Sequence, residues 1–74
     1  MSVPGHKVLH DLIEREAYRR IMSGEMPERL DQFAQQLLGW LRERYPGAPP
    51  MTRDTVENQI RETWDRRHDL IRGG

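Results

Sequence analysis

The sequence predicts an all-α domain, folded as a compact bundle of three helices. Apolar residues recur every three to four positions in three separate stretches, which is the spacing of one buried helix face. Proline and glycine stand between these stretches and are absent from the interior of the first and the last of them. No stretch alternates apolar and polar residues over the length of a half-buried strand, so no β-sheet is expected.

The first helix is predicted over residues 7–22, after a flexible tail at residues 1–5. Gly24 is expected at the left-handed position that ends many helices. Arg19 and Arg20 fall in the last turns, where cations stabilise the negative end of the helix dipole. The apolar face is expected to carry Val8, Leu9, Leu12, Ile13, Ala17 and Ile21.

The second helix is predicted over residues 27–45 and holds the densest apolar content of the chain. Pro27 suits the first helical position, where its missing N–H is not needed. Tyr45 should end the helix because it precedes Pro46. Only residues 24–26 would then link the first two helices, which makes them direct neighbours. The expected core residues here are Leu30, Phe33, Leu37, Trp40 and Leu41.

The third helix is predicted over residues 52–71, after a proline-rich loop at residues 46–50. Thr52 is the expected N-cap. Met51 and Val56 would flank it as a hydrophobic staple. The expected buried stripe consists of Val56, Ile60, Trp64 and Ile71. The single domain thus covers residues 6–72, and residues 73–74 form a flexible end.

Length and charge narrow the classes of function. A chain of 74 residues forms one domain. It has twelve basic and twelve acidic residues, so the strong net charge of many nucleic-acid-binding domains is missing. It has no cysteine, no apolar run of about 18 residues and no apolar leader at its start. A soluble cytoplasmic protein without a membrane partner is expected.

Catalytic and metal-binding patterns are weak. The chain has no cysteine nucleophile and no glycine-rich phosphate loop, and so short a chain hardly encloses a pocket. We therefore expect no enzyme, no cofactor and no small-molecule substrate. His6, His10 and Glu14 share a spacing of four, which is compatible with a metal ion. A solvated helix face is the favoured interpretation, so no metal site is predicted.

The start of the third helix, MTRDTVENQIRETWDRR, suggests one type of binding module. Thr52 and Arg53 open it, and Thr55-Val56 is followed by Ile60 four residues after the valine. This pattern resembles the recognition helix of small helix-turn-helix domains. The resemblance implies that exposed residues of this helix face the DNA major groove, where Arg reads guanine and Asn reads adenine. These residues are Arg53, Thr55, Asn58 and Arg61, with Asp54 beside them.

Two features depart from that pattern. The link at residues 46–51 is longer than the usual turn of three or four residues. The outward face of the helix also carries acids, which oppose contact with phosphates. These acids are Asp54, Glu62, Asp65 and Asp69. An ordinary bundle with a salt-bridged outer face therefore stays open beside the DNA-binding interpretation.

The outer face of the second helix suggests the alternative function, a protein-interaction module. Gly39 costs about 1 kcal/mol relative to Ala inside a helix, and it would let another helix approach closely. Leu38, Tyr18 and Met22 are expected to be partly exposed nearby. The predicted interaction residues are Gln32, Gln35, Gln36, Gly39 and Glu43. The chain would then act as an adaptor, a regulatory subunit or a small inhibitor on a larger complex, or as a homodimer.

Taken together, these observations predict a small, non-enzymatic regulatory binding module. Its arrangement is helix-turn-helix-like, with DNA as one partner class. A protein partner held by the outer face of the second helix is the alternative.

Overall fold

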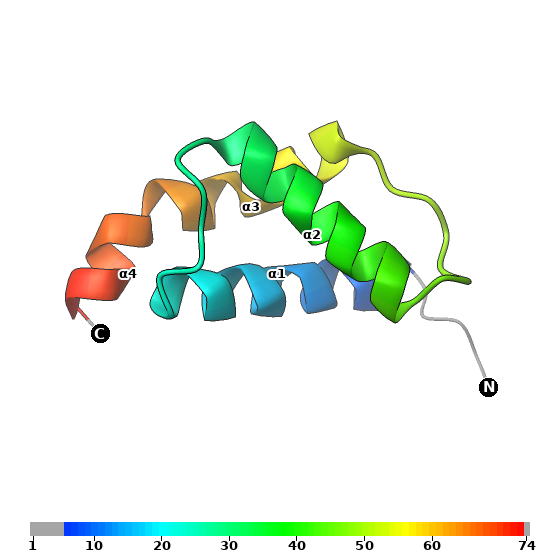
Figure 1. Cartoon of the computed structure of the whole chain (residues 1–74), viewed down its shortest axis with the longest axis horizontal. Helices are drawn as coiled ribbons and strands as arrows, with labels where there is room; N and C mark the ends of the chain where they lie inside the picture. Colours follow the sequence, from blue (N-terminus) through cyan, green and yellow to red (C-terminus); the bar gives the residue numbers. More distant parts are fainter. Residues whose placement is uncertain (1–5, 74) are drawn as a thin grey trace.

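Four helices account for most of residues 6–73, the part of the chain that the computed structural model describes (Figure 1). They are α1 (His6–Met22), α2 (Leu30–Arg44), α3 (Arg53–Asp65) and α4 (Arg67–Gly73). Residues 6–73 contain no strand. The prediction of an all-α fold is therefore confirmed, with the third predicted helix divided into α3 and α4.

The helices pack as a small bundle about 39 Å long, with a Cα radius of gyration of 12.2 Å. α1 runs along one long side, and α2 crosses it diagonally (Figure 1). α1 contacts each of the other three helices, and α3 packs against both α1 and α2. The short α4 contacts both α1 and α3, and it lies beside the C-terminal end of α1 (Figure 1).

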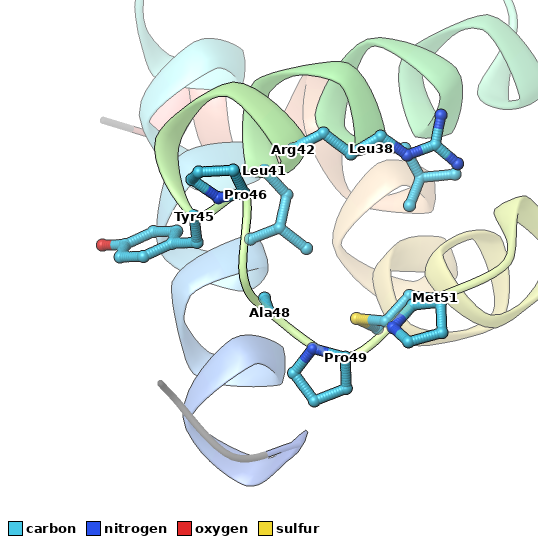
Figure 2. A pocket seen from close by; sticks show the side chains of 9 residues that line it. Leu38, Leu41, Arg42, Tyr45, Pro46, Ala48, Pro49 and Met51 are labelled. Atoms are coloured by element: carbon cyan, nitrogen blue, oxygen red, sulfur yellow. The ribbon is translucent and has the colours of Figure 1, made fainter. Parts of the chain in front are cut away.

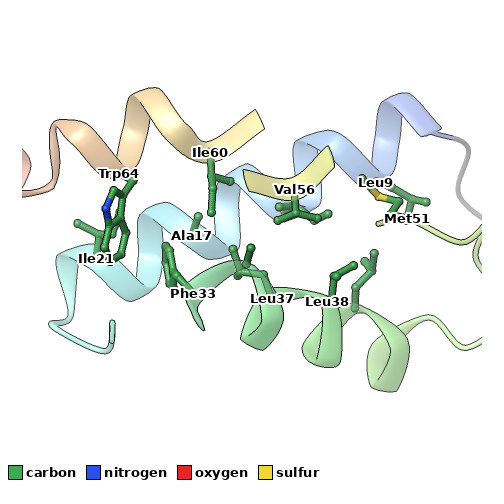
Figure 3. Close-up of a cluster of buried hydrophobic side chains, with 13 residues drawn as sticks. Leu9, Ala17, Ile21, Phe33, Leu37, Leu38, Met51, Val56, Ile60 and Trp64 are labelled. Atoms are coloured by element: carbon green, nitrogen blue, oxygen red, sulfur yellow. The ribbon is translucent and has the colours of Figure 1, made fainter. Parts of the chain in front are cut away.

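One apolar core lies between α1, α2 and α3 (Figure 3). Phe33 and Leu37 of α2 are fully buried, and the Phe33 ring lies 5.2 Å from the Trp64 ring of α3, centre to centre. The complete set of buried core side chains is Leu9, Ile13, Ala17, Ile21, Phe33, Ala34, Leu37, Leu38, Leu41, Met51, Val56, Ile60 and Trp64. The predicted core residues Phe33, Leu37, Leu41, Val56, Ile60 and Trp64 are thus confirmed.

Several predicted burial states are wrong. Leu30 and Trp40 pack at the margin of the core and are only partly buried. Trp40 lies at the edge of the buried face of α2, and its ring contacts Tyr45 edge-on at 6.4 Å. Val8 is 50% exposed, although it was expected on the apolar face, whereas Leu38 is only 4% exposed. Leu30 is the first residue of α2, and Val8 lies on the side of α1 that faces away from the core, so apolar character alone did not decide their burial.

The C-terminal end of α1 confirms the role predicted for Gly24. Its φ is +78°, in the left-handed region. Its N–H donates to the Ile21 carbonyl at 3.1 Å, and the Glu25 N–H donates to the Arg20 carbonyl at 2.7 Å. These two bonds form a Schellman motif, which satisfies carbonyls that a helix end leaves unpaired.

The predicted start of α2 is wrong by three residues, because the helix begins at Leu30 rather than Pro27. Arg29 precedes it with an extended backbone and pairs with the Asp31 carboxylate at 3.0 Å. The link is therefore residues 23–29, longer than expected. Within this link the Met26 side chain packs against the core, a contact that the sequence analysis does not anticipate.

The N-terminus of α3 forms as predicted. The Thr55 N–H donates to the Thr52 hydroxyl at 3.2 Å, so Thr52 is the N-cap. Met51 before the cap and Val56 after it are both buried in the core, as a hydrophobic staple requires.

The predicted continuous helix over residues 52–71 is interrupted at Arg66, whose φ and ψ are −92° and 6°. Beyond it, Arg67 donates to the Trp64 carbonyl at 2.9 Å. The interruption changes which side chain faces the core, because Leu70 packs against it and Ile71 is 45% exposed. The prediction that Ile71 belongs to the buried stripe is therefore wrong.

Candidate functional site

The outer face of α2 carries a nearly uncharged row of polar residues, which we call the α2 strip. Its members point away from the core, and all of them are exposed as predicted. Gly39 at its centre has an ordinary helical backbone, since Gly24 alone among the described glycines has a positive φ. A Cβ built on Gly39 would meet no atom within 4 Å. The strip consists of Gln32, Gln35, Gln36, Gly39 and Glu43.

This geometry removes every folding reason for glycine at position 39. No tight backbone turn and no neighbouring side chain requires it. Glycine there destabilises the helix by about 1 kcal/mol relative to alanine. The three glutamines supply amide donors and acceptors without charge, so a second backbone can approach Gly39 without burying an ion.

The second predicted set lies on the first turns of α3, and we call it the α3 polar face. All four side chains are exposed. At about 100° per residue, Arg53 and Thr55 lie on nearly opposite sides of α3, so the set covers more than one side of the helix. The Thr55 hydroxyl is engaged with that of Thr52 at 2.9 Å. Arg53 and Arg61 form no ion pair within the described part of the chain. The face consists of Arg53, Thr55, Asn58 and Arg61.

Acidic side chains share the outward side of α3 and α4, as the sequence predicts. Asp54, Glu62, Asp65 and Asp69 are all exposed. The Glu62 carboxylate pairs with Arg66 at 3.2 Å, and both side chains remain largely in water. The electrostatic character of this side is therefore mixed.

The link between α2 and α3 covers residues 45–52, a length beyond the usual turn of a helix-turn-helix motif. It encloses a small pocket of about 210 Å³ against the end of α2 (Figure 2). Leu38, Leu41 and Met51 form the apolar floor, and Arg42 is the one charged lining residue. Pockets for small ligands measure roughly 300–1,000 Å³, so this one is small for such a ligand.

Sequence reasoning missed this pocket. The available signal is the run of prolines at positions 46, 49 and 50 between the half-buried Tyr45 and the buried Met51. A stiff loop fixed at both ends by apolar side chains cannot collapse onto the helix end. This leaves the space that the pocket occupies.

Charged side chains at the end of α1 form a cluster of ion pairs, and none of them belongs to the α2 strip or the α3 polar face. Glu16 accepts hydrogen bonds from Arg19 at 3.0 and 3.1 Å and from Arg20 at 2.7 Å. The hydrogen bonds from Arg19 lower the pKa of Glu16, partial burial opposes them, and the bond from Arg20 adds to the lowering. The Ser23 hydroxyl, at 2.7 Å, is the main cause of the lowered pKa of Glu25. This cluster stabilises the helix end.

Among the side chains of residues 6–73 that the structure describes, no three metal-binding groups lie close enough to hold an ion. The His6 side chain, part of the metal-like spacing, lies outside the described side chains. Within the same residues, none of the helices has both the length and the apolar character needed to cross a bilayer.

No protein-family model, curated protein or solved structure matches this chain. The fold and its surfaces therefore define the class: a small all-α domain with two exposed polar faces.

Proposed function

We propose that this chain is a small, non-enzymatic regulatory binding module that docks on a protein partner through the α2 strip. The observation that carries the proposal is Gly39, an exposed mid-helix glycine with no atom within 4 Å of its missing Cβ. Among the described residues, no contact compensates its cost to the helix. A partner helix lying across the strip would offset this cost through packing contacts, because the absence of a side chain lets two backbones approach closely.

The neighbouring residues favour a particular kind of partner surface. Gln32, Gln35 and Gln36 present amides around Gly39, and Glu43 places one carboxylate at the end of the strip. Amides hydrogen-bond well to other uncharged polar groups. The partner is thus a helix with small and polar residues, carrying a basic residue opposite Glu43. We also propose a cytoplasmic location, for which the lack of cysteine is the support.

DNA binding is the second candidate, and the exposed guanidiniums of Arg53 and Arg61 favour it. Both lie on the first turns of α3, without an ion-pair partner among residues 6–73. Arg reads guanine and Asn58 would read adenine in the helix-turn-helix arrangement. The long link before α3 and the acids beside the arginines make this candidate the weaker of the two.

One experiment separates the two candidates. The immobilised full chain is used to capture partners from a lysate of its source cells, with and without nuclease treatment. Gly39→Arg should abolish capture of the protein partner, because a long charged side chain fills the centre of the strip. Gly39→Ala is the graded comparison: its one methyl group should weaken capture less than Gly39→Arg does, because only the closest backbone approach is lost. Helical circular dichroism should be unchanged in both variants.

The second part of the experiment tests DNA binding through Arg53 and Arg61. A DNA-binding module should lose retention on a low-salt DNA column when Arg53→Ala or Arg61→Ala is introduced, and its affinity should fall steeply with salt. Protein capture that survives nuclease and disappears only with Gly39→Arg supports the proposal. Equal capture by Gly39→Arg and the native chain contradicts it.

A further inference from the structure

A second exposed row runs along α1, on the side opposite its buried stripe, and we call it the α1 row. Its members are spaced by three, four, three and four positions, so they follow one line along the helix. Val8, Tyr18 and Met22 are 50%, 48% and 39% exposed. They are three of the four large apolar side chains that lie exposed in the described part of the chain. The row consists of Val8, Asp11, Arg15, Tyr18 and Met22.

The middle of the α1 row carries one negative and one positive charge. Asp11 and Arg15 are both exposed, and neither forms an ion pair with another described residue. Arg19, next to the row, is instead engaged by Glu16 and Glu25. Asp11 and Arg15 therefore keep their charges available for a partner.

The order of these residues is self-complementary. In the forward direction the row is apolar, acidic, basic, apolar: Val8, Asp11, Arg15, Tyr18. A second copy running in the opposite direction places Arg15 against Asp11 and Tyr18 against Val8. A parallel copy would instead place Asp11 on Asp11 and Arg15 on Arg15, which is repulsive. The charge pattern thus selects the antiparallel arrangement.

We propose that two copies of this chain associate through the α1 row, with their α1 helices antiparallel. The two-fold axis passes beside position 13, midway between Asp11 and Arg15. Such an interface is isologous, because both copies use the same surface. It contains two Asp11–Arg15 ion pairs, flanked on each side by one contact between Val8 and Tyr18. The alternating spacing of three and four suits helices that cross at about 20°.

The surroundings of the row permit this approach. α1 lies along one long side of the bundle, with the other helices on its opposite side (Figure 1). Glu14, Arg15, Tyr18 and Thr63 line a shallow depression of about 310 Å³ beside the row, which keeps this flank open to water. The Glu14 carboxylates lie on this open flank, where water screens their mutual repulsion. The contact area of one helix pair is small, so association is weak and reversible.

The test is sedimentation velocity of the full chain from micromolar to millimolar concentration, first at low salt. The native chain should show a concentration-dependent monomer–dimer equilibrium. About 1 M salt should weaken it, because the Debye length then falls to about 3 Å. Asp11→Arg and Arg15→Asp should each raise the dissociation constant roughly tenfold, because each replaces two attractive pairs by two repulsive ones.

Two matched controls restore the charge pattern. The doubly exchanged chain, with Asp11→Arg and Arg15→Asp together, should dimerise as the native chain does. An equimolar mixture of the two single variants should form heterodimers about as tightly as the native chain dimerises, although each variant alone pairs with itself more weakly. Circular dichroism and thermal unfolding confirm that each variant is folded, which is expected because both side chains are exposed.

Three results would overturn the inference: a native chain that stays monomeric at millimolar concentration, single variants that dimerise unchanged, or a double exchange that fails to restore the dimer. A dimer that is lost with Gly39→Arg but retained with Arg15→Asp would place self-association on the α2 strip and also contradict this inference. The α1 row is independent of the proposed function, since none of its residues belongs to the α2 strip.

Discussion

The Arg67 guanidinium lies over the Trp64 indole ring, 4.2 Å from its centre, and donates a hydrogen bond of 2.9 Å to the Trp64 carbonyl. Trp64 is the last large core residue of α3, and Arg67 is the first residue of α4. One side chain therefore fixes the junction of two helices, where the backbone departs from the path of a single continuous helix.

Removing this contact should loosen α4. Arg67→Ala loses a cation–π contact of about 0.5–1 kcal/mol together with a hydrogen bond. We expect a loss of about 1–2 kcal/mol in the free energy of unfolding and faster amide exchange in α4, measured by urea titration and hydrogen exchange. Arg66→Ala is the control, because its exposed ion pair with Glu62 contributes at most about 1 kcal/mol. Equal effects of the two variants would contradict a specific role for Arg67.

Gly24, after the end of α1, and Gly39, inside α2, should respond oppositely to alanine. Gly24→Ala forces a Cβ into the left-handed region at φ +78° and should destabilise the chain by about 1–2 kcal/mol. Gly39→Ala meets no neighbour and should stabilise it by up to about 1 kcal/mol. Chemical denaturation of the two variants measures both signs. A stabilising Gly24→Ala would refute the Schellman end of α1.

Leu37 should dominate the stability of the core. It is fully buried, so Leu37→Ala should cost about 2–5 kcal/mol, enough to unfold many domains of this size. Leu37→Met keeps the volume and should cost less than about 1.5 kcal/mol. Leu30→Ala, at the margin of the core, should cost clearly less than Leu37→Ala. Thermal unfolding followed by circular dichroism ranks the three variants, and a different order would contradict this packing.

Acid should destabilise the chain partly through Glu16. Its pKa is lowered in the folded state by Arg19 and Arg20, so the unfolded chain takes up a proton at higher pH than the folded one. The stabilisation from Glu16 is therefore complete above the unfolded pKa, near 4.5, and is lost as the pH falls through the lower folded pKa. Glu16→Gln should remove this part of the acid dependence.

Urea titrations between pH 7 and pH 3 measure the effect. The native chain should lose more stability over this range than Glu16→Gln does. Glu62→Gln is the control for the loss of one carboxylate, since its ion pair with Arg66 is exposed. An unchanged pH slope in Glu16→Gln would contradict the assignment.

Gln59 holds α3 against α1 through an incomplete polar contact. Its Nε2 donates to the His10 carbonyl, whereas its buried Oε1 has no hydrogen-bond partner among the described residues. Gln59→Met removes both the bond and the unpaired oxygen, so its stability should lie within about 1 kcal/mol of the native value. Gln59→Glu places a carboxylate against a carbonyl and should destabilise the chain by more. The difference between the two, measured by urea at pH 7, should vanish if Gln59 is solvated.

The exposure of the candidate surfaces could be predicted from the sequence. The α2 strip and the α3 polar face are exposed as the helical spacing indicates, because the side opposite a buried stripe faces water. The α1 row is only partly recognisable from the sequence, since the spacing predicts Val8 on the apolar face of the first helix and Val8 is half exposed. The pocket beside Arg42 could not be derived, because it depends on where residues 45–52 lie against the end of α2. Which partners these surfaces bind stays a prediction.

The sequence by itself determined the features that depend on residues a few positions apart. These are the all-α class, the extent of α1, its end at Gly24 and the cap of α3 at Thr52. Only the tertiary structure decided the late start of α2, the interruption at Arg66 and the marginal place of Trp40. Contacts between distant parts of the chain accompany these features, such as Met26 with the core and α4 with α1. Local spacing carries no information about such contacts, because the free energy that fixes them comes from burial against other helices.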